Sequence, residues 1–166
     1  MFILHSCTKS LITPIGTVVG GRVDPTDDHW GGRAIIRLNP DFPVEVVQGL
    51  EEFSHLLVVR HFHKASPNDV AQHPHARSPR NNPAWPPTGT FVHRHHRRPN
   101  QLAQSFPRLV KVDGLDLHVA DLDAIDGTPI HDVAPYFQEM GPRGEVRGPS
   151  RPAEMLADYW RSRGLA

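Results

Sequence analysis

Two short segments concentrate side chains that could hold a charged small molecule. The first, Arg94-His95-His96-Arg97-Arg98, places three arginines and two histidines within five residues. A planar guanidinium can bind a carboxylate or a phosphate through two parallel hydrogen bonds. The second is Asp126-Gly127-Thr128-Pro129, where we expect free backbone groups, close approach at the glycine and a carboxylate acceptor. Taken without its neighbours, such a tetrapeptide is more often only a tight loop.

The 12 histidines raise the question of a metal site, because imidazole is a common ligand of zinc and nickel. Two histidines separated by one residue lie on the same face of a strand, but they do not by themselves fix a tetrahedral geometry. No cysteine or His-Glu motif completes them, so we predict no metal site. His55 is typical of a hydrogen-bonded structural residue, whereas His63 ends an apolar strand beside the expected pocket. The pairs in question are His61 and His63, His73 and His75, and His93 and His95, with His96 beside the last.

Short strands joined by irregular loops must position these groups. The 17 prolines and 13 glycines are spread along the chain, and no long helical period occurs before the C-terminus. The sequence therefore predicts a mainly β fold, a closed or nearly closed barrel, with a long surface loop from His73 to Thr90. Asp113-Gly114 is typical of a hairpin turn. Strands are expected at 13–19, 33–38, 56–62, 106–112, 115–119 and 130–133.

The C-terminal end has a different pattern. Ser150 is a residue type that caps helices, and Pro152 is tolerated in a first helical turn. We expect a short helix here, with an apolar stripe that docks onto the barrel or onto a partner subunit. The chain would then divide into a barrel domain, residues 1–138, and a C-terminal extension, residues 139–166. The stripe consists of Met155, Leu156, Tyr159 and Trp160, before Gly164.

Composition limits the kinds of protein that the chain can be. Its 166 residues suit one compact domain. Lys plus Arg and Asp plus Glu are both 18, so an RNA partner would have to meet a local basic patch rather than a basic protein. No stretch approaches the ~18 apolar residues of a membrane helix, and the first residues are too short and polar for a secretory signal. Cys7 has no disulfide partner, so we expect a soluble cytoplasmic protein.

Four blocks of the sequence share their order and spacing with a known pattern. Residues 89–105 are similar to G-V-F-A-T-R-S-P-x-R-P-N-P-I-G-L-S, and residues 49–56 are similar to G-L-E-x-F-S-H-L. Residues 123–136 are similar to D-L-L-D-G-T-P-V-L-D-I-K-P-Y, and Pro14-Ile15-Gly16 forms the fourth block. Through these blocks the chain resembles the TsaA-like family of β-barrel methyltransferases. In the longest block it keeps Gly89, Phe91, Arg94, Arg98, Pro99, Asn100 and Ser105.

The resemblance implies a single-sheet β-barrel homodimer that binds S-adenosylmethionine near the subunit boundary. The best-known members of the family methylate N6 of threonylcarbamoyl-adenosine beside the tRNA anticodon. By the same resemblance, Arg97, Arg98 and Asn100 are expected near the methyl acceptor. No residue is singled out as a general base. The expected cofactor contacts are His63, Lys64, Arg94, Leu102, Asp126, Gly127, Thr128 and Pro129.

The chain departs from the longest block at two places. His93-Arg94-His95-His96 stands where the family has T-R-S-P, and Asn100-Gln101-Leu102-Ala103 stands where it has N-P-I-G. These departures weaken the prediction of the methyl acceptor more than that of the cofactor, so two alternative functions stay open. One is a methyltransferase that acts on a small molecule, which the zero net charge favours. The other is a non-catalytic regulator that binds a metal or a nucleotide on the same barrel, which the histidines suggest.

Overall fold

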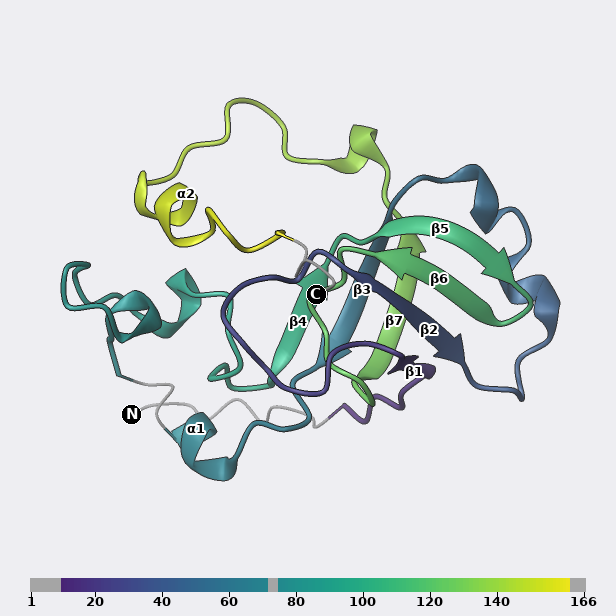
Figure 1. Cartoon of the computed structure of the whole chain (residues 1–166), viewed down its shortest axis with the longest axis horizontal. Coiled ribbons are helices and arrows are strands. Elements are labelled where there is room, and N and C mark those ends of the chain that lie inside the picture. Colours follow the sequence, from purple (N-terminus) through teal and green to yellow (C-terminus); the bar gives the residue numbers. More distant parts are fainter. Residues whose placement is uncertain (1–9, 72–74, 162–166) are drawn as a thin grey trace, which may run out of the picture.

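The computed structural model describes residues 10–71 and 75–161 (Figure 1), so Cys7, His73 and Gly164 lie outside the described residues. Seven strands form one antiparallel sheet in the order β4-β3-β7-β1-β2-β6-β5. They are β1 (Gly16–Val19), β2 (Arg33–Leu38), β3 (Leu56–His61), β4 (Leu102–Ser105), β5 (Arg108–Asp113), β6 (Asp116–Ala120) and β7 (Pro129–Pro135). The helices are α1 (Pro67–Ala71), α2 (Arg151–Met155) and the 3-10 turns η1 (Val44–Val47), η2 (Leu50–Glu52), η3 (Pro79–Asn81), η4 (Thr90–Val92) and η5 (Gln138–Met140).

The sheet closes on itself where β5 meets the beginning of β3. The Leu56 N–H donates to the Pro107 carbonyl at 3.0 Å, and the Leu109 N–H donates to the Ser54 carbonyl at 2.8 Å. Closure gives partners to backbone groups that an open edge would leave unpaired. The prediction of a mainly β, closed or nearly closed barrel is therefore confirmed. The Asp113-Gly114 hairpin is confirmed as well, because β5 and β6 pair up to Asp113 and Asp116.

Alternating residues of the strands fill the barrel. In β2 the side chains of Ala34, Ile36 and Leu38 are buried, while those of Arg33 and Arg37 are exposed. This period of two is what an antiparallel sheet with one solvated face requires. Each fully buried aliphatic side chain stabilises the fold by about 1.5–3 kcal/mol. The most deeply buried members of the core are Val18, Ile36, Leu56, Val58, Leu117, Val119 and Ile130.

Strand β3 and its two neighbours carry the groups of functional interest. β4 was not predicted from the sequence, and it pairs with β3 from His61 and Leu102 to Val58 and Ser105. On the other side, β7 pairs with β3 in a register that shifts between Val59 and Arg60. Val59 lies opposite Asp132 and Arg60 lies opposite Ile130, so His131 is an extra residue on β7. Such a bulge bends the strand and changes the direction of what precedes it.

The C-terminal segment leaves the barrel after η5, arches away from it and returns through α2 (Figure 1). The expected helix is present but is only five residues long, and Ser150 makes no side-chain capping bond. Burial of the predicted stripe against the barrel is wrong for two of its members, because Leu156 is 40% exposed and Trp160 is 49% exposed, while docking of these two onto a partner subunit stays a prediction. The division at residue 138 remains a prediction. None of the described helices is long and apolar enough to cross a membrane.

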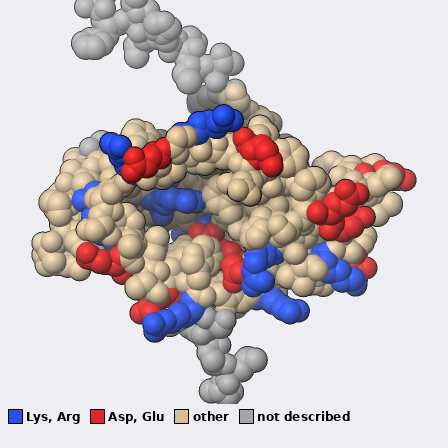
Figure 2. Space-filling model, turned by 90° about the horizontal axis from the view of Figure 1, so that it is seen from above, with Lys and Arg blue, Asp and Glu red and all other residues tan. Residues whose placement is uncertain are grey.

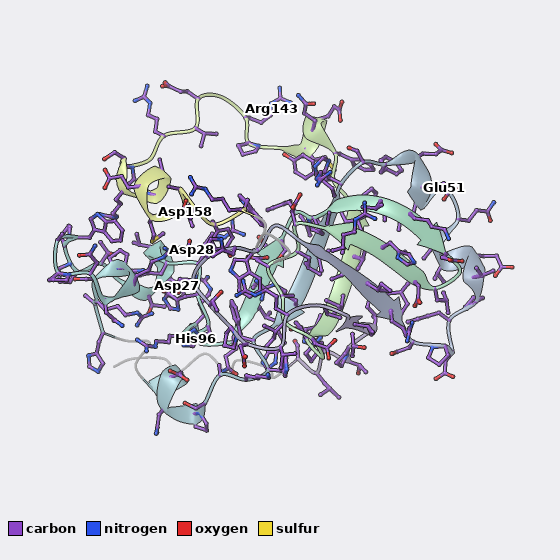
Figure 3. All side chains as sticks on the ribbon, viewed as in Figure 1. Asp27, Asp28, Glu51, His96, Arg143 and Asp158 are labelled. Carbon is purple, nitrogen blue, oxygen red and sulfur yellow. The ribbon has the colours of Figure 1, made fainter. Side chains whose placement is uncertain are left out.

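Backbone hydrogen bonds, rather than an apolar stripe, hold this segment on the barrel. The Trp30 N–H donates to the Tyr159 carbonyl at 2.7 Å, and the His29 N–H donates to the Asp158 carbonyl at 3.2 Å. A Cβ atom on Gly31 would lie only 2.0 Å from the Trp160 carbonyl oxygen. Only a glycine therefore allows the two chain segments to come this close. Figure 3 shows Asp28 and Asp158 on neighbouring segments, with Glu51 at the opposite end of the molecule.

Candidate functional site

The ends of three strands meet at one end of the barrel. β3 ends at His61, β4 begins at Leu102 opposite it, and β7 begins at Pro129. The Phe62 N–H donates to the Gln101 carbonyl at 2.9 Å, which extends the pairing beyond the strands. Because the strands are antiparallel, the end of one lies beside the beginnings of its two neighbours. The structure thus brings His63, Leu102 and the turn of residues 126–129 together, as the sequence predicts.

The turn 126–129 is fixed by its backbone. Gly127 has a φ of 74°, in the left-handed region that favours glycine. The Asp126, Gly127 and Thr128 N–H groups donate to the carbonyls of Arg22, Val18 and Ile125 at 2.6, 2.8 and 3.1 Å. The expectation that this turn offers free backbone N–H groups is therefore wrong, because these three are already bonded and Pro129 has none. What faces solvent is Gly127 and the Asp126 side chain.

The Asp126 carboxylate keeps one oxygen for a ligand. Its Oδ1 accepts a hydrogen bond from the Gly20 N–H at 2.9 Å, which fixes the side chain. Within the described residues, no donor bonds its Oδ2. An oriented carboxylate oxygen of this kind suits a hydroxyl or amine donor. Gly20 also borders an open hollow of about 330 Å³ between β1, β2, β5 and β6, which Arg33, Lys111 and His118 help to line.

His63 lies beside the turn and is uncharged near neutral pH. Its Nε2 is 4.0 Å from the position that a Cβ atom on Gly127 would take. Partial burial, together with the charges of Lys64 and His61, lowers the pKa of His63 below its usual value of 6.5. Lys64 itself donates from Nζ to the Val23 carbonyl at 2.9 Å, so it ties the loop after β1 to the end of β3.

Arg94 lies farther along β4 than the other expected cofactor contacts. Its Nη2 donates to the Gln104 carbonyl at 2.6 Å, and the side chain is otherwise exposed. Among the described residues, no hydrogen bond or ion pair joins it to the turn 126–129. Arg94 therefore lies beside β4, close enough to the Tyr159 hydroxyl to affect its pKa, with most of its guanidinium donors available for an anionic group.

An aspartate of α1 neutralises part of the basic segment. Arg97 Nε lies 3.4 Å from Asp69 Oδ1, and His96 Nε2 lies at the same distance from that oxygen. Arg97 is thus half-buried against α1 (Figure 3 labels His96 beside α1). Hydrogen bonds from Ser66 lower the pKa of Asp69 to about 2, so the carboxylate is charged.

The other arginines of this region differ in their partners. Arg80 makes two hydrogen bonds to the Asp28 carboxylate, at 3.0 and 2.8 Å. Arg77 contacts His95, and Arg98 donates from Nη1 to the His93 carbonyl at 2.9 Å. Within residues 75–161 and their described neighbours, no carboxylate pairs with Arg77, Arg94 or Arg98. These three guanidinium groups therefore carry net positive charge, in a protein whose total charge is zero.

The part of the chain that the structure describes contains no group of three or more His, Cys, Asp or Glu side chains placed to hold a metal ion. His61 and His131 approach each other with ring centroids 6.0 Å apart, and His93 and His95 lie 5.2 Å apart. Each is a pair of rings in contact. Neither pair is joined by the further ligands that a tetrahedral site needs.

The sequence pattern of the tRNA-methyltransferase O N-terminal domain matches residues 27–141. This match covers more than half of the chain. The chain belongs to the tRNA-methyltransferase O family. Its barrel has the same fold as the solved TrmO from Pseudomonas aeruginosa, with a TM-score of 0.67 and 26% identity over 84% of this chain and 62% of that chain.

Relatives in the tRNA-methyltransferase O family differ in length. A probable S-adenosyl-L-methionine-binding protein of Methanothermobacter thermautotrophicus is 30% identical over 80% of this chain and 94% of its own length. A probable S-adenosyl-L-methionine-binding protein of Pyrococcus abyssi is 34% identical, over 68% of this chain and 56% of that protein. The human tRNA (adenine(37)-N6)-methyltransferase is 33% identical, over 70% of this chain and 24% of that enzyme. The chain thus spans about half or less of several longer relatives.

A buried polar network, which the sequence did not reveal, lies on the inner side of β3 and β4. Arg60 is 4% exposed and donates from Nε to Ser105 Oγ at 2.9 Å. Its Nη2 lies 3.2 Å from Asp123 Oδ2, and Ser105 contacts the other oxygen of Asp123. The Tyr159 hydroxyl donates to Asp123 Oδ2 at 2.7 Å, and burial beside this carboxylate raises the pKa of Tyr159.

This network connects the family domain to the C-terminal segment. Tyr159 lies beyond residue 141, where the match to the tRNA-methyltransferase O N-terminal domain ends. Seen from the side of the C-terminal segment, the molecule is hollowed, and Lys or Arg side chains line the bottom of the hollow beside Asp or Glu (Figure 2). A sequence signal for the network did exist, since Arg60 continues the buried alternation of Leu56 and Val58 in β3.

Proposed function

We propose that the chain is an S-adenosylmethionine-dependent methyltransferase that methylates N6 of a modified adenosine, threonylcarbamoyl-adenosine, in the anticodon loop of tRNA. The observation that carries the proposal is the meeting of His63, Leu102 and the turn 126–129 at one end of the barrel. Membership of the tRNA-methyltransferase O family supports the reaction type. The names of its relatives support both the donor and the RNA acceptor.

The side chains at this end of the barrel fit the chemistry of the donor. Asp126 Oδ2 can accept hydrogen bonds from ribose hydroxyls, and exposed Gly127 lets a flat ring approach the backbone. An uncharged His63 imidazole does not repel a positively charged sulfonium. Arg94 has guanidinium donors left for a carboxylate. The ribose, the sulfonium and the carboxylate of S-adenosylmethionine therefore each find a group of suitable character.

When bound, S-adenosylmethionine supplies a methyl group on a sulfonium, which a nitrogen nucleophile can take. The work left to the protein is to bind, to orient and to exclude water, and positioning of this kind can supply most of the rate. The backbone of residues 126–128 is locked onto β1 and the loop after it, which keeps the Asp126 carboxylate in one orientation. The bulge in β7 and the pairing of His61 with Leu102 set the position of His63 relative to it.

The arginines supply the side that would face RNA. Arg77, Arg94 and Arg98 have no carboxylate partner among the described residues, so each can neutralise a phosphate. Exposed Asn100 follows Arg98 and could bond a base edge or a ribose. Arg97 remains an expected acceptor-side residue, although Asp69 already neutralises much of its charge. This local excess of positive charge favours RNA over a small molecule as the acceptor.

A homodimer would complete the site, and its cytoplasmic location would follow from the tRNA substrate. In one chain His63 is half-buried, while Asp126 and Gly127 are exposed. A methyl donor needs protection from bulk water, so a second surface must cover this end of the barrel. Sedimentation at micromolar concentration measures the association, and a monomer that still binds the donor with full affinity would contradict the dimer.

The test of the function is methyl transfer from labelled S-adenosylmethionine to two separate acceptor pools, bulk tRNA and a small-metabolite extract. We expect label in tRNA, and nucleoside analysis should find it on N6 of a threonylcarbamoyl-adenosine. Label in the small-metabolite pool alone would replace tRNA with the small-molecule alternative. Calorimetry that shows no donor binding would leave the non-catalytic regulator and reject the methyltransferase.

A further inference from the structure

An aromatic ring stands out from the basic segment. Phe91, in the middle of η4, is 77% exposed, and its neighbour Val92 is 62% exposed. An exposed apolar side chain is ordinary by itself. What distinguishes Phe91 is its place in the segment 89–105, where it lies along the chain between Arg77 and the other two uncompensated arginines, Arg94 and Arg98.

Arg98 places a cation against this ring. Its guanidinium carbon is 5.5 Å from the centroid of the Phe91 ring. Arg98 is half-buried, and its Nη1 is fixed by a 2.9 Å hydrogen bond to the His93 carbonyl. The flat guanidinium is therefore held in place without a carboxylate among the described residues to neutralise it. An aromatic face and a fixed guanidinium together offer a surface on which a flat, electron-rich ring can stack.

The backbone that carries Phe91 is held on both sides. Before it, Arg77 and Thr88 exchange two backbone hydrogen bonds at 3.1 and 2.9 Å. After it, His93 Nε2 lies 2.9 Å from Thr88 Oγ1, which closes the short loop around η4. A backbone held in this way loses little further freedom when a ligand stacks on the ring it carries, and so more of the stacking energy remains for binding.

We infer that Phe91 and Arg98 form a stacking site for an unpaired nucleobase of the RNA substrate, next to the base that is methylated. The inference rests on the proposed function, because it takes the acceptor to be a single-stranded loop of RNA. Proteins hold such loops by stacking bases on aromatic rings and on guanidinium planes, with arginines along the phosphates. Arg77 and Arg94 supply those nearby charges. Two exposed apolar residues offer far less than the ~800 Å² that a stable protein partner covers.

The first experiment compares two aromatic substitutions. Phe91→Ala should weaken binding of an anticodon stem-loop, measured by fluorescence anisotropy, about 5- to 150-fold, because stacking on one side chain contributes roughly 1–3 kcal/mol. Donor affinity, measured by calorimetry, should not change. The matched control is Phe42→Ala, since Phe42 is also exposed but precedes η1, which lies at the far side of the barrel from η4 (Figure 1). Phe91→Trp should retain binding, and its indole fluorescence should change when RNA is added.

The second experiment identifies the stacked base. A series of stem-loops is prepared, each with one abasic position in the loop. For one abasic position, the stem-loop should bind the wild-type protein less tightly than the intact loop does. Phe91→Ala should bind that abasic stem-loop and the intact loop with equal affinity. If wild type and Phe91→Ala bind the intact loop equally well, the stacking site is wrong while the proposed function stands. The exposed ring would then be assigned to contact with a protein partner. If wild type binds no RNA, both the stacking site and the tRNA acceptor are wrong.

Discussion

Two regions are built by different means: the proposed donor end of the barrel, where His63, Leu102 and the turn 126–129 meet, and the basic segment, which comprises residues 75–100. At the donor end, backbone hydrogen bonds between Gly127 and Val18, and between Val18 and Thr128, fix the groups at 2.8 and 3.0 Å. Among the described residues of the basic segment, the one backbone bridge between distant residues joins Arg77 and Thr88, and the other backbone bonds close local turns. Ion pairs such as Arg80 with Asp28 and Arg97 with Asp69 attach the segment to its surroundings. Sheet register therefore sets the proposed donor site, whereas local turns and charge pairing set the proposed acceptor side. Substitutions should affect stability and donor binding in the first region, and RNA binding and its salt dependence in the second.

The largest effect should come from the network inside the barrel. Asp123→Asn removes the charge that neutralises buried Arg60 while keeping the shape of the side chain. Loss of one partner of a buried ion pair costs about 3–5 kcal/mol. Urea denaturation should show this decrease in the free energy of unfolding. A matched Asp69→Asn variant, beside the basic segment, should lose much less, and equal losses would abolish the contrast between the two regions.

The second largest effect should be that of Asp126→Asn on the affinity for the methyl donor. One charge-assisted hydrogen bond contributes about 1.5–3 kcal/mol, so the donor dissociation constant should rise roughly tenfold or more. Calorimetry measures it directly. Asp132→Asn is the control, because Asp132 is exposed on β7 and, among the described residues, its Oδ1 accepts only from the neighbouring Val133 N–H. A folded Asp126→Asn protein with unchanged donor affinity would place the donor elsewhere.

Within the basic segment, Arg98→Ala and Arg97→Ala should differ in their salt dependence. Arg98 has no carboxylate partner among the described residues, whereas Arg97 lies 3.4 Å from Asp69. For each phosphate that the protein ceases to neutralise, the slope of log binding constant against log salt changes by roughly 0.7 for single-stranded RNA. Arg98→Ala should show this change and Arg97→Ala a smaller one, with donor affinity nearly intact for Arg97→Ala. Equal slopes for the two variants would mean that the Asp69 pair does not survive in the RNA complex.

Acidification should weaken donor binding through His63. Its pKa lies below the usual 6.5, so the imidazole is neutral at pH 7 and gains a proton only at lower pH. The proton adds positive charge beside the expected sulfonium, and the donor dissociation constant should rise as the pH falls below 6.5. The same shift makes the fold less stable there, because the unfolded chain takes up the proton first. A His63→Gln variant should show no such rise, and a rise that persists in it would assign the effect to another group.

Trp160→Ala should have the smallest effect. A fully buried tryptophan would cost about 3–5 kcal/mol, but Trp160 is half exposed, and about 1–2 kcal/mol is expected. Tyr159→Phe should cost about 1.5–3 kcal/mol, because it removes a hydrogen bond to a charged carboxylate. Thermal or urea unfolding of the two variants gives the order. A larger loss of stability for Trp160→Ala than for Tyr159→Phe would mean that the apolar stripe, and not the hydrogen bond, holds the C-terminal segment on the barrel.

The strands of strong alternation were predictable from the sequence, and the weak ones were not. β2 agrees with its predicted range at both ends, because Arg33–Leu38 alternates between exposed and buried positions. β4 has the sequence Leu-Ala-Gln-Ser, which lacks β-branched and aromatic residues, and it is a strand because β3 offers it a pairing edge. Leu156 and Trp160 are not buried against the barrel for a related reason, since α2 ends at Met155 and tertiary hydrogen bonds determine the backbone after it.

Of the candidate site, the sequence predicted which segments meet but not how each group is used. The meeting of His63 with Gly127 followed from resemblance, since sequence spacing alone cannot place residues so far apart. The use of the N–H groups at 126–128 depends on the path of the loop after β1, which no local pattern encodes. Buried Arg60 and its partner Asp123 were missed because charged residues are usually exposed.

The extra residue in β7 has a consequence for where this chain tolerates insertions and deletions. His131 lies between Ile130 and Asp132, which are opposite consecutive residues of β3. Deleting it would make the ladder regular with Ile130 still opposite Arg60, so residues 126–129 would keep their register but would lose the bend that the bulge gives to β7. A deletion or insertion in the surface loop around residues 82–87 displaces no strand. The donor end of the barrel should therefore keep its length even where neighbouring loops gain or lose residues.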